Sequence, residues 1–94
     1  MKDFDYKALA KELLENLYRD GMMFVVYPDG ESEVTSQNAG YFPIKPLVKI
    51  DLSAWYWESG VLGEYDLENL SEADTEYLIE YLEEEIESEV AKVA

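Results

Sequence analysis

The segment SEADTEYLIEYLEEEIESEVAKV, residues 71–93, decides the predicted fold. Ser71 with an acidic residue three positions later gives a start that resembles a helix capping box, so we expect a helix from Glu72 to about Val93. At 100° per residue, the apolar side chains of this helix gather on one side. They are Leu78, Ile79, Leu82, Ile86, Val90 and Val93. This stripe predicts that one side of the helix packs against the rest of the domain.

The opposite side of the predicted helix carries carboxylates. Glu76, Glu80, Glu83, Glu84 and Glu87 lie there with Tyr77 beside them, Glu72 and Glu85 flank them, and Glu89 falls within the apolar sector. Like charges at i,i+4 destabilise a helix by about 0.2 to 0.5 kcal/mol per pair, so the like pairs here cost roughly 1 to 2.5 kcal/mol. A domain of this size is stable by about 5 to 10 kcal/mol. Folding alone therefore does not favour this pattern.

The first half of the chain predicts a helix followed by a small antiparallel sheet. Apolar residues at helical spacing predict a helix over residues 4–19, with Asp3 as its N-cap and Gly21 after its end. The runs 22–27 and 32–36 flank a Pro-Asp-Gly turn and predict a hairpin. Residues 37–46 contain two prolines and predict a loop or an edge segment, and residues 47–52 alternate like a third strand.

The stretch SAWYWESG, residues 53–60, fits two structures. Trp55 and Trp57 alternate with Tyr56 as in a strand, which is the interpretation we prefer, although Ser53 could instead cap a short helix that stops at Gly60. Residues 61–70 predict a connecting loop. The expected fold is a single α+β domain with an N-terminal helix, a small antiparallel sheet of three or four strands, and a long acidic C-terminal helix.

Composition excludes several kinds of functional site. The 94 residues include no cysteine and no histidine, which excludes disulfides, thiolate zinc sites and histidine-based triads. Asp29, Glu31 and Glu33 superficially resemble a calcium loop, but its sixth position is Val34 instead of glycine and its twelfth is Gly40 instead of glutamate. A chain this small also lacks the cleft that a carboxylate-pair glycosidase needs. We therefore expect no enzyme activity, no cofactor and no metal.

The net charge of −15 is distributed unevenly. Residues 1–50 hold eight acidic and six basic residues, whereas residues 51–94 hold fourteen acidic residues and a single base, Lys92. Such polarity disfavours direct contact with nucleic acid or an anionic membrane and favours a basic protein surface as partner. The N-terminus does not read as a secretory signal, and no stretch approaches the length of a membrane span, so a cytoplasmic protein is expected.

The density of acidic residues in the last helix is close to that of DNA. Nine carboxylates lie between Glu72 and Glu89, about one for every 3 Å of helix axis, and one DNA strand has a phosphate about every 3.4 Å. In size, acidity and uneven charge, the chain resembles small phage-encoded inhibitors of bacterial defence, namely the anti-CRISPR and anti-restriction proteins that act as DNA mimics. The resemblance implies that carboxylates fill the Lys/Arg cleft of a nuclease or surveillance complex and exclude its DNA.

The candidate partner-binding residues follow from this hypothesis. They are Glu76, Tyr77, Glu80, Glu83, Glu84 and Glu87 of the last helix, with Glu64, Asp66 and Glu68 of the preceding loop. The loop acids and Glu58 would form a second row if they fold beside the helix. Two alternatives stay open: an acidic adaptor or assembly module that binds a basic protein without competing with DNA, and a plain solvated helix face. A homodimer, which would double the charged surface, is compatible with either binding function.

Several aromatic side chains have both a packing and a binding interpretation. Tyr77 and Tyr81 suit a protein interface, although we expect Tyr81 to pack at the margin of the core. For Trp55 and Trp57, and for the pair at residues 41–42, we expect packing within the domain, because large aromatics supply much of the buried area in a small protein.

Overall fold

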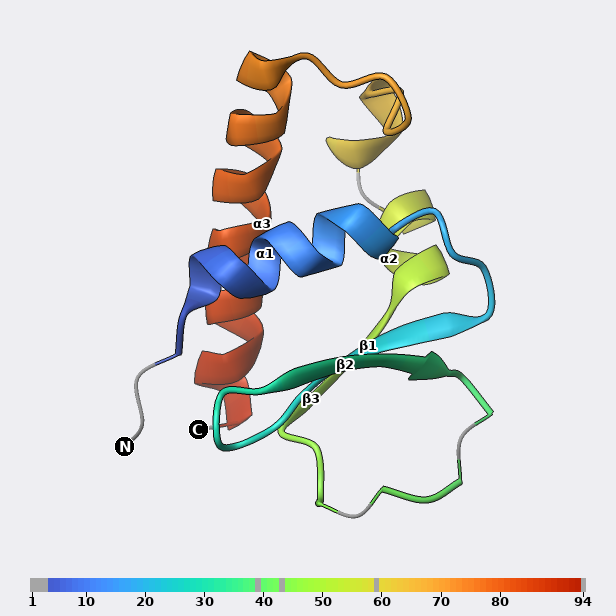
Figure 1. Ribbon diagram of the computed structural model, residues 1–94, viewed down its shortest axis with the longest axis vertical. Coiled ribbons are helices and arrows are strands. Elements are labelled where there is room, and N and C mark those ends of the chain that lie inside the picture. Colours follow the sequence, from blue (N-terminus) through green and yellow to red (C-terminus); the bar gives the residue numbers. More distant parts are fainter. Residues whose placement is uncertain (1–3, 39, 43, 59, 94) are drawn as a thin grey trace.

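The computed structural model describes residues 4–38, 40–42, 44–58 and 60–93. Figure 1 shows the helices on one side of a three-stranded antiparallel sheet and a long loop on the other. In chain order the elements are α1 (Tyr6–Asn16), β1 (Met22–Val26), β2 (Ser32–Ser36), β3 (Val48–Asp51), α2 (Leu52–Glu58), the 3-10 helix η1 (Leu62–Glu64) and α3 (Glu72–Val93). The predicted α+β architecture is confirmed.

Helix α1 is shorter than the sequence predicts because its first turn is capped from residue 5. The Asp5 carboxylate accepts a hydrogen bond from the Ala8 backbone N–H at 3.1 Å, and the helix begins immediately after this N-cap. The predicted cap, Asp3, lies outside the described residues. Beyond the helix, Gly21 adopts a φ of +76°, a conformation that glycine tolerates best, and turns the chain into β1.

The sheet has the strand order β2-β1-β3, and both pairs are antiparallel. The predicted hairpin is confirmed, with Gly30 at a φ of +90° in its turn. Phe24 lies opposite Val34 on one side and Ile50 on the other, so the three side chains share the face that the helices cover. Alternation along β1 keeps Met22 and Val26 on this face and sends Met23 and Val25 to the opposite face.

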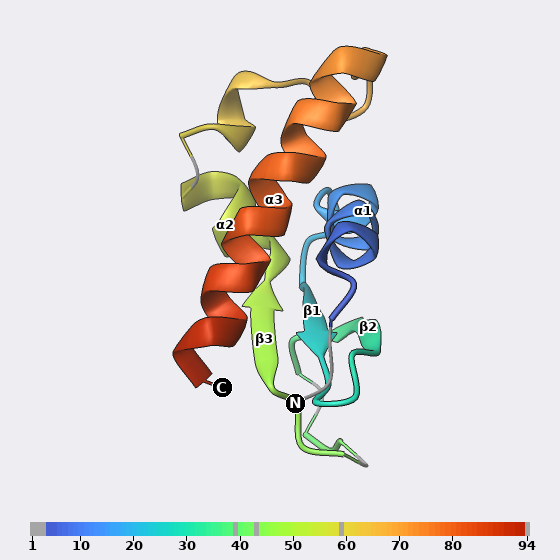
Figure 2. The same cartoon turned by 90° about the vertical axis from the view of Figure 1, so that its left-hand side faces the viewer.

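The main core lies between this sheet face and the two long helices. Helix α1 crosses α3 steeply, and α3 also runs alongside β3 (Figure 2). Leu9, Ala10, Leu13 and Leu17 of the α1 segment meet Leu78, Leu82, Ile86 and Val90 of α3, all at most 4% exposed. The bounds predicted for α3 are confirmed. Its apolar stripe ends one turn early, however, because Val93 is 55% exposed at the last turn.

Residues 52–58 form helix α2, so the predicted fourth strand is wrong. Asp51, the last residue of β3, accepts a hydrogen bond from the Ala54 N–H at 3.2 Å, as an N-cap does. Leu52 is fully buried, and Trp55 packs partly against the core. Trp57 is 77% exposed, contrary to the expectation that it packs within the domain. The alternative of a short helix was therefore correct, although Asp51 provides the cap that we assigned to Ser53.

The outer face of the sheet has its own small apolar cluster. Met23, Val25 and Tyr27 are buried there, and Phe42 from the loop packs on them. The Lys49 ammonium lies 5.1 Å from the centre of the Phe42 ring, within the range of a cation–π contact. Packing of the aromatic pair is thus confirmed for Phe42 and wrong for Tyr41, which is 81% exposed.

The Tyr27 phenol on this outer face should make the free energy of unfolding depend on pH in the alkaline range. Its hydroxyl donates to the Glu33 carboxylate at 2.6 Å, and this hydrogen bond, followed by burial, raises the pKa of Tyr27. A pKa that is raised by folding stabilises the protein fully below the unfolded value near pH 10, and this stabilisation is lost as pH rises through the folded-state pKa. We expect Tyr27→Phe to flatten the fall in unfolding free energy above pH 10. Urea unfolding at pH 8 to 11 measures how steeply the unfolding free energy falls with pH in the unchanged protein and in Tyr27→Phe. Equal slopes in the two proteins would contradict the role assigned to this hydrogen bond.

Candidate functional site

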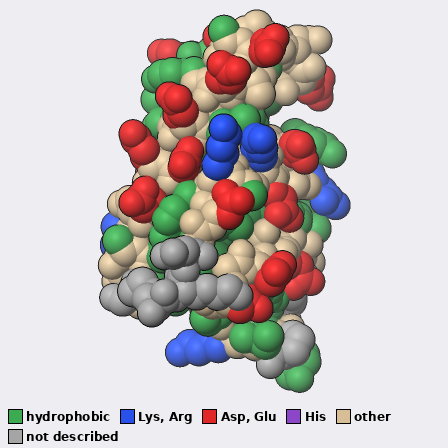
Figure 3. All heavy atoms as spheres, turned by 60° about the vertical axis from the view of Figure 1, so that its left-hand side comes forward, with side chains coloured by type: hydrophobic (Ala, Val, Ile, Leu, Met, Phe, Trp, Pro, Cys, Tyr) green, Lys and Arg blue, Asp and Glu red, His purple; other side chains and the backbone are tan. Residues whose placement is uncertain are grey.

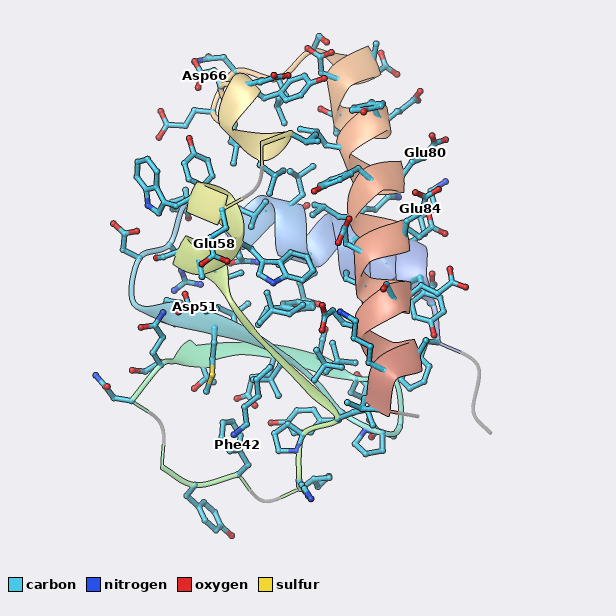
Figure 4. The ribbon with its side chains drawn as sticks, turned by 180° about the vertical axis from the view of Figure 1, so that it is seen from behind. Phe42, Asp51, Glu58, Asp66, Glu80 and Glu84 are labelled. Carbon is cyan, nitrogen blue, oxygen red and sulfur yellow. The ribbon has the colours of Figure 1, made fainter. Side chains whose placement is uncertain are left out.

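The outward side of α3 presents a continuous set of carboxylates, which we call the α3 acidic surface: Glu76, Glu80, Glu83, Glu84 and Glu87. All of them are exposed except Glu83, which is half-buried. Figure 4 shows Glu80 and Glu84 pointing away from the body of the protein. The buried stripe on the other side of α3 fixes the helix and therefore the backbone positions from which these side chains project. The side of the helix that was predicted to be acidic therefore faces solvent.

Two tyrosines border this surface along α3. Tyr77 is 50% exposed, and its ring centre lies 6.3 Å from that of Tyr65 in the preceding segment. Tyr81 is partly buried against the core, so its predicted place at the core margin is confirmed. The side chains of Tyr77, Glu80, Tyr81 and Glu84 together line a shallow hollow of about 130 Å³. Aromatic rings and carboxylates are thus mixed on this part of α3.

A second acidic row lies beyond the tyrosines, between α2 and α3. Glu58 of α2 lines a hollow of about 200 Å³ together with Glu85 and Glu89 of α3, and the rings of Trp55 and Tyr81 share its walls. One base lies near, because the Lys92 ammonium is 3.2 Å from the Glu89 carboxylate. On the helix, the angular positions of Tyr77 and Tyr81 fall between this row and the α3 acidic surface. The carboxylates therefore form two rows on either side of an aromatic strip.

Two lysines of α1 face the opposite border of the α3 acidic surface. A groove of about 560 Å³ between α1 and α3 is lined by Lys7, Lys11, Glu76, Ile79, Glu80 and Glu83. Figure 3 shows basic side chains in the middle of this face with carboxylates around them. The sequence does not predict this arrangement, because the lysines lie some 70 positions before the α3 carboxylates in the chain. Their i,i+4 spacing on the N-terminal helix was the available signal.

The lysines divide the carboxylates of α3 into two groups that we expect to differ in their effect on stability. Glu84→Gln with Glu87→Gln removes two like-charge i,i+4 pairs by changing residues that do not line the groove with Lys7 and Lys11, and should raise the unfolding free energy by about 0.4 to 1 kcal/mol. Glu80→Gln with Glu83→Gln removes three such pairs, 76/80, 80/84 and 83/87, but also loses the attraction of Glu80 and Glu83 to the lysines.

The second double variant should therefore gain less stability than the first, or lose some. Urea unfolding at low and at high salt measures the unfolding free energies of the two double variants. Added salt should reduce the difference between these free energies, because it screens the charges. If Glu80→Gln with Glu83→Gln were the more stable variant at low salt by about 0.5 kcal/mol or more, the full value of its one extra like-charge pair, Lys7 and Lys11 would not be compensating the charge of α3.

The acidic residues of the loop before α3 do not extend either row. Asp66 and Glu68 line a different hollow, beside α2 and the end of α1, and Figure 4 shows Asp66 far from Glu80 and Glu84. Glu64 is exposed on η1 and lines none of the three hollows described above that contain α3 carboxylates. Of the acids expected to form a second row, Glu58 lies beside the α3 carboxylates, whereas Asp66 and Glu68 belong to another surface.

The described residues offer no sign of a metal centre, since no group of acidic side chains within these ranges is arranged to hold an ion. In the same part of the chain, no charged or polar side chain is buried, and no helix has the length and apolar character needed to cross a membrane. Comparisons of the chain with protein-family models, with curated proteins and with solved structures find no match.

Proposed function

We propose that this chain is a non-enzymatic inhibitor that places the α3 acidic surface in the basic cleft of a nucleic-acid-binding protein and so excludes DNA. The proposed targets are the nucleases and surveillance complexes of bacterial defence. The observation that carries this proposal is the pair of carboxylate rows along α3, which face solvent on a helix whose other side is fixed by the core. A partner with complementary charge would meet a preformed surface.

The two rows favour mimicry of a duplex over a diffuse acidic field. Duplex DNA presents two lines of phosphates, and cleft proteins bind them with lysine and arginine regardless of sequence. Here Glu80, Glu84 and Glu87 supply one line, and Glu58 with Glu85 begins the other. Because every contact of this kind is a charge pair, association should be fast and should weaken steeply as salt is added.

The stability cost of the charges supports a role beyond solubility. Lys7 and Lys11 lie against only one border of the α3 acidic surface, so they offset part of the repulsion. The hollow that Glu84 lines contains no basic residue, and both Glu84 and Glu87 belong to like-charge pairs along the helix. Negative charge that is left uncompensated at the exposed centre of a helix is consistent with selection for a partner.

An acidic adaptor that binds a basic protein without displacing DNA is the second candidate. The observation in its favour is the half-exposed ring of Tyr77 beside the carboxylates, because aromatic anchors are typical of protein interfaces. The two candidates differ in one property: a mimic and DNA cannot occupy the target together, whereas an adaptor and DNA can.

Phage plating tests the proposed inhibition in cells. The protein would be expressed in bacteria that carry one defined restriction or CRISPR-Cas system, across a panel of such systems, and challenged with a phage that the system restricts. We expect plating efficiency to rise in at least one system, and the rise to vanish with Glu80→Gln, Glu84→Gln and Glu87→Gln combined. Unchanged restriction across the panel, with the protein shown to be folded and abundant, would argue against this function.

A further inference from the structure

A hollow of about 280 Å³ lies where the end of α1, helix α2 and the segment 66–68 meet. We call it the aromatic hollow, after three of its lining side chains, Tyr18, Tyr56 and Trp57; its acidic lining residues are Asp20, Asp66 and Glu68. It is separate from the α3 acidic surface, with which it shares no lining residue. The same face of the protein thus combines exposed rings with carboxylates.

Two of the three aromatic rings of this hollow are unusually open to solvent. Trp57 is 77% exposed and Tyr18 is 68% exposed, although rings of this size normally supply buried area in a small domain. Tyr56 meets Trp57 edge to face, with ring centres 5.2 Å apart and planes at 89°. This contact supports the indole from one side. A tryptophan face that is both held and exposed is the best aromatic surface for a cation.

The acidic lining residues are held by hydrogen bonds. Asp20 accepts from the Ser53 hydroxyl at 3.1 Å. Asp66 accepts from the Asn69 side-chain amide at 3.0 Å and from the Glu68 backbone N–H at 3.1 Å, and these bonds lower the pKa of Asp66. Asp66 is therefore ionised at neutral pH, and hydrogen bonds position both carboxylates before any ligand arrives.

No base neutralises these carboxylates within the hollow, as far as the described residues extend. Arg19 is next to Asp20 in the chain, but its guanidinium donates to the Asn16 side chain at 3.2 Å and does not line the hollow. The carboxyl end of α1, which carries partial negative charge, ends beside it. The hollow is therefore complementary to a positive group.

We propose that the aromatic hollow binds an arginine side chain presented by a partner protein. A guanidinium is planar and stacks on an indole or phenol face while its N–H groups reach carboxylates in a fixed fork, a geometry that a lysine ammonium lacks. Arginine is also enriched at protein interfaces, where aromatic rings anchor it. The inference does not depend on the function of α3, because the two surfaces are separate.

Nuclear magnetic resonance titration of the full chain with the peptide acetyl-Gly-Arg-Gly-amide tests this inference. We expect the indole N–H signal of Trp57, assigned by its loss in Trp57→Ala, to shift with added peptide. The signal of Trp55, which lines a different hollow, should stay in place. The same peptide with citrulline, which keeps the shape of arginine without its charge, should bind at least about tenfold more weakly.

Two single variants and one matched control complete the test. Trp57→Ala, followed through the backbone amides of the hollow, and Glu68→Gln should each weaken arginine-peptide binding about two- to fivefold. Glu84→Gln, which removes one charge from the α3 acidic surface, should leave it unchanged. Equal shifts with the citrulline peptide, equal affinity for the same peptide with lysine in place of arginine, or shifts centred on α3 would each overturn the inference.

Discussion

Replacing Glu80, Glu84 and Glu87 by glutamine should weaken binding to the target about 100-fold. If each lost charge pair contributes roughly 1 kcal/mol at the interface, three pairs give about 3 kcal/mol, and a tenfold change in Kd corresponds to about 1.4 kcal/mol. The three side chains are exposed on α3, so the variant should keep the fold. Association kinetics at two salt concentrations measure the effect, which should appear mainly in the association rate at low salt.

A matched triple variant separates a local surface from overall charge. Glu15→Gln, Glu31→Gln and Glu64→Gln also remove three exposed carboxylates, but from α1, the hairpin turn and η1. If the α3 acidic surface binds the partner, this variant should change Kd by less than about threefold, because screening limits the reach of distant charges. Equal losses of affinity in the two triple variants would indicate that only net charge matters.

Among the variants proposed for this protein, Leu82→Ala should lower the free energy of unfolding the most, by about 2 to 5 kcal/mol. Leu82 is fully buried on the side of α3 that faces the core, and its loss leaves a cavity beneath the helix that carries the carboxylates. Because a domain of this size is stable by only about 5 to 10 kcal/mol, much of the folded population could be lost at higher temperature. Urea unfolding followed by circular dichroism measures the change.

Two further variants of α3 show how large a stability loss to expect from a smaller buried change and from an exposed change. Ile86→Val deletes one methyl from the same buried stripe and should cost about 0.5 to 1.5 kcal/mol. Val93→Ala alters a side chain that is 55% exposed at the end of the helix and should cost less than about 0.5 kcal/mol. A loss below about 1 kcal/mol for Leu82→Ala would mean that α3 does not dock through this stripe.

The elements that the sequence predicts well are those whose signals are local and repeated. Helix α3 has its cap at Ser71, whose hydroxyl accepts from the Asp74 N–H at 3.1 Å, and several turns of apolar spacing, so its bounds follow from the pattern. The hairpin follows from the turn sequence and Gly30. In both cases neighbouring residues contain nearly all the information that decides the structure.

The sequence predicts an element poorly where the contacts of one or two side chains decide its structure. Residues 53–58 alternate large aromatics as a strand would, yet the Asp51 carboxylate caps a helix at this point and Leu52 anchors it in the core. Alternation over so few residues does not say whether a partner strand is available. The exposure of Trp57 follows from the same difference, since a helix turns this ring away from the sheet.

The same distinction applies to the candidate site: features set by nearby residues could be predicted from the sequence, and features set by distant residues could not. The solvent-facing side of α3 could be predicted, because periodicity fixes which carboxylates share a face. The neighbours of those carboxylates could not, since Lys7, Lys11 and Glu58 reach α3 only through the tertiary fold. The aromatic hollow is likewise assembled from three segments and has no signature in any one of them.

Competition with DNA tests the central claim most directly. A fluorescent duplex would be bound to the purified defence protein identified by phage plating, and its anisotropy followed as this protein is added. Displacement of the duplex, with an apparent affinity that falls steeply with salt and about 100-fold in Glu80→Gln, Glu84→Gln and Glu87→Gln combined, is the result that DNA mimicry predicts. A ternary complex, in which the inhibitor binds while the duplex stays in place, would contradict mimicry and identify the chain as an adaptor.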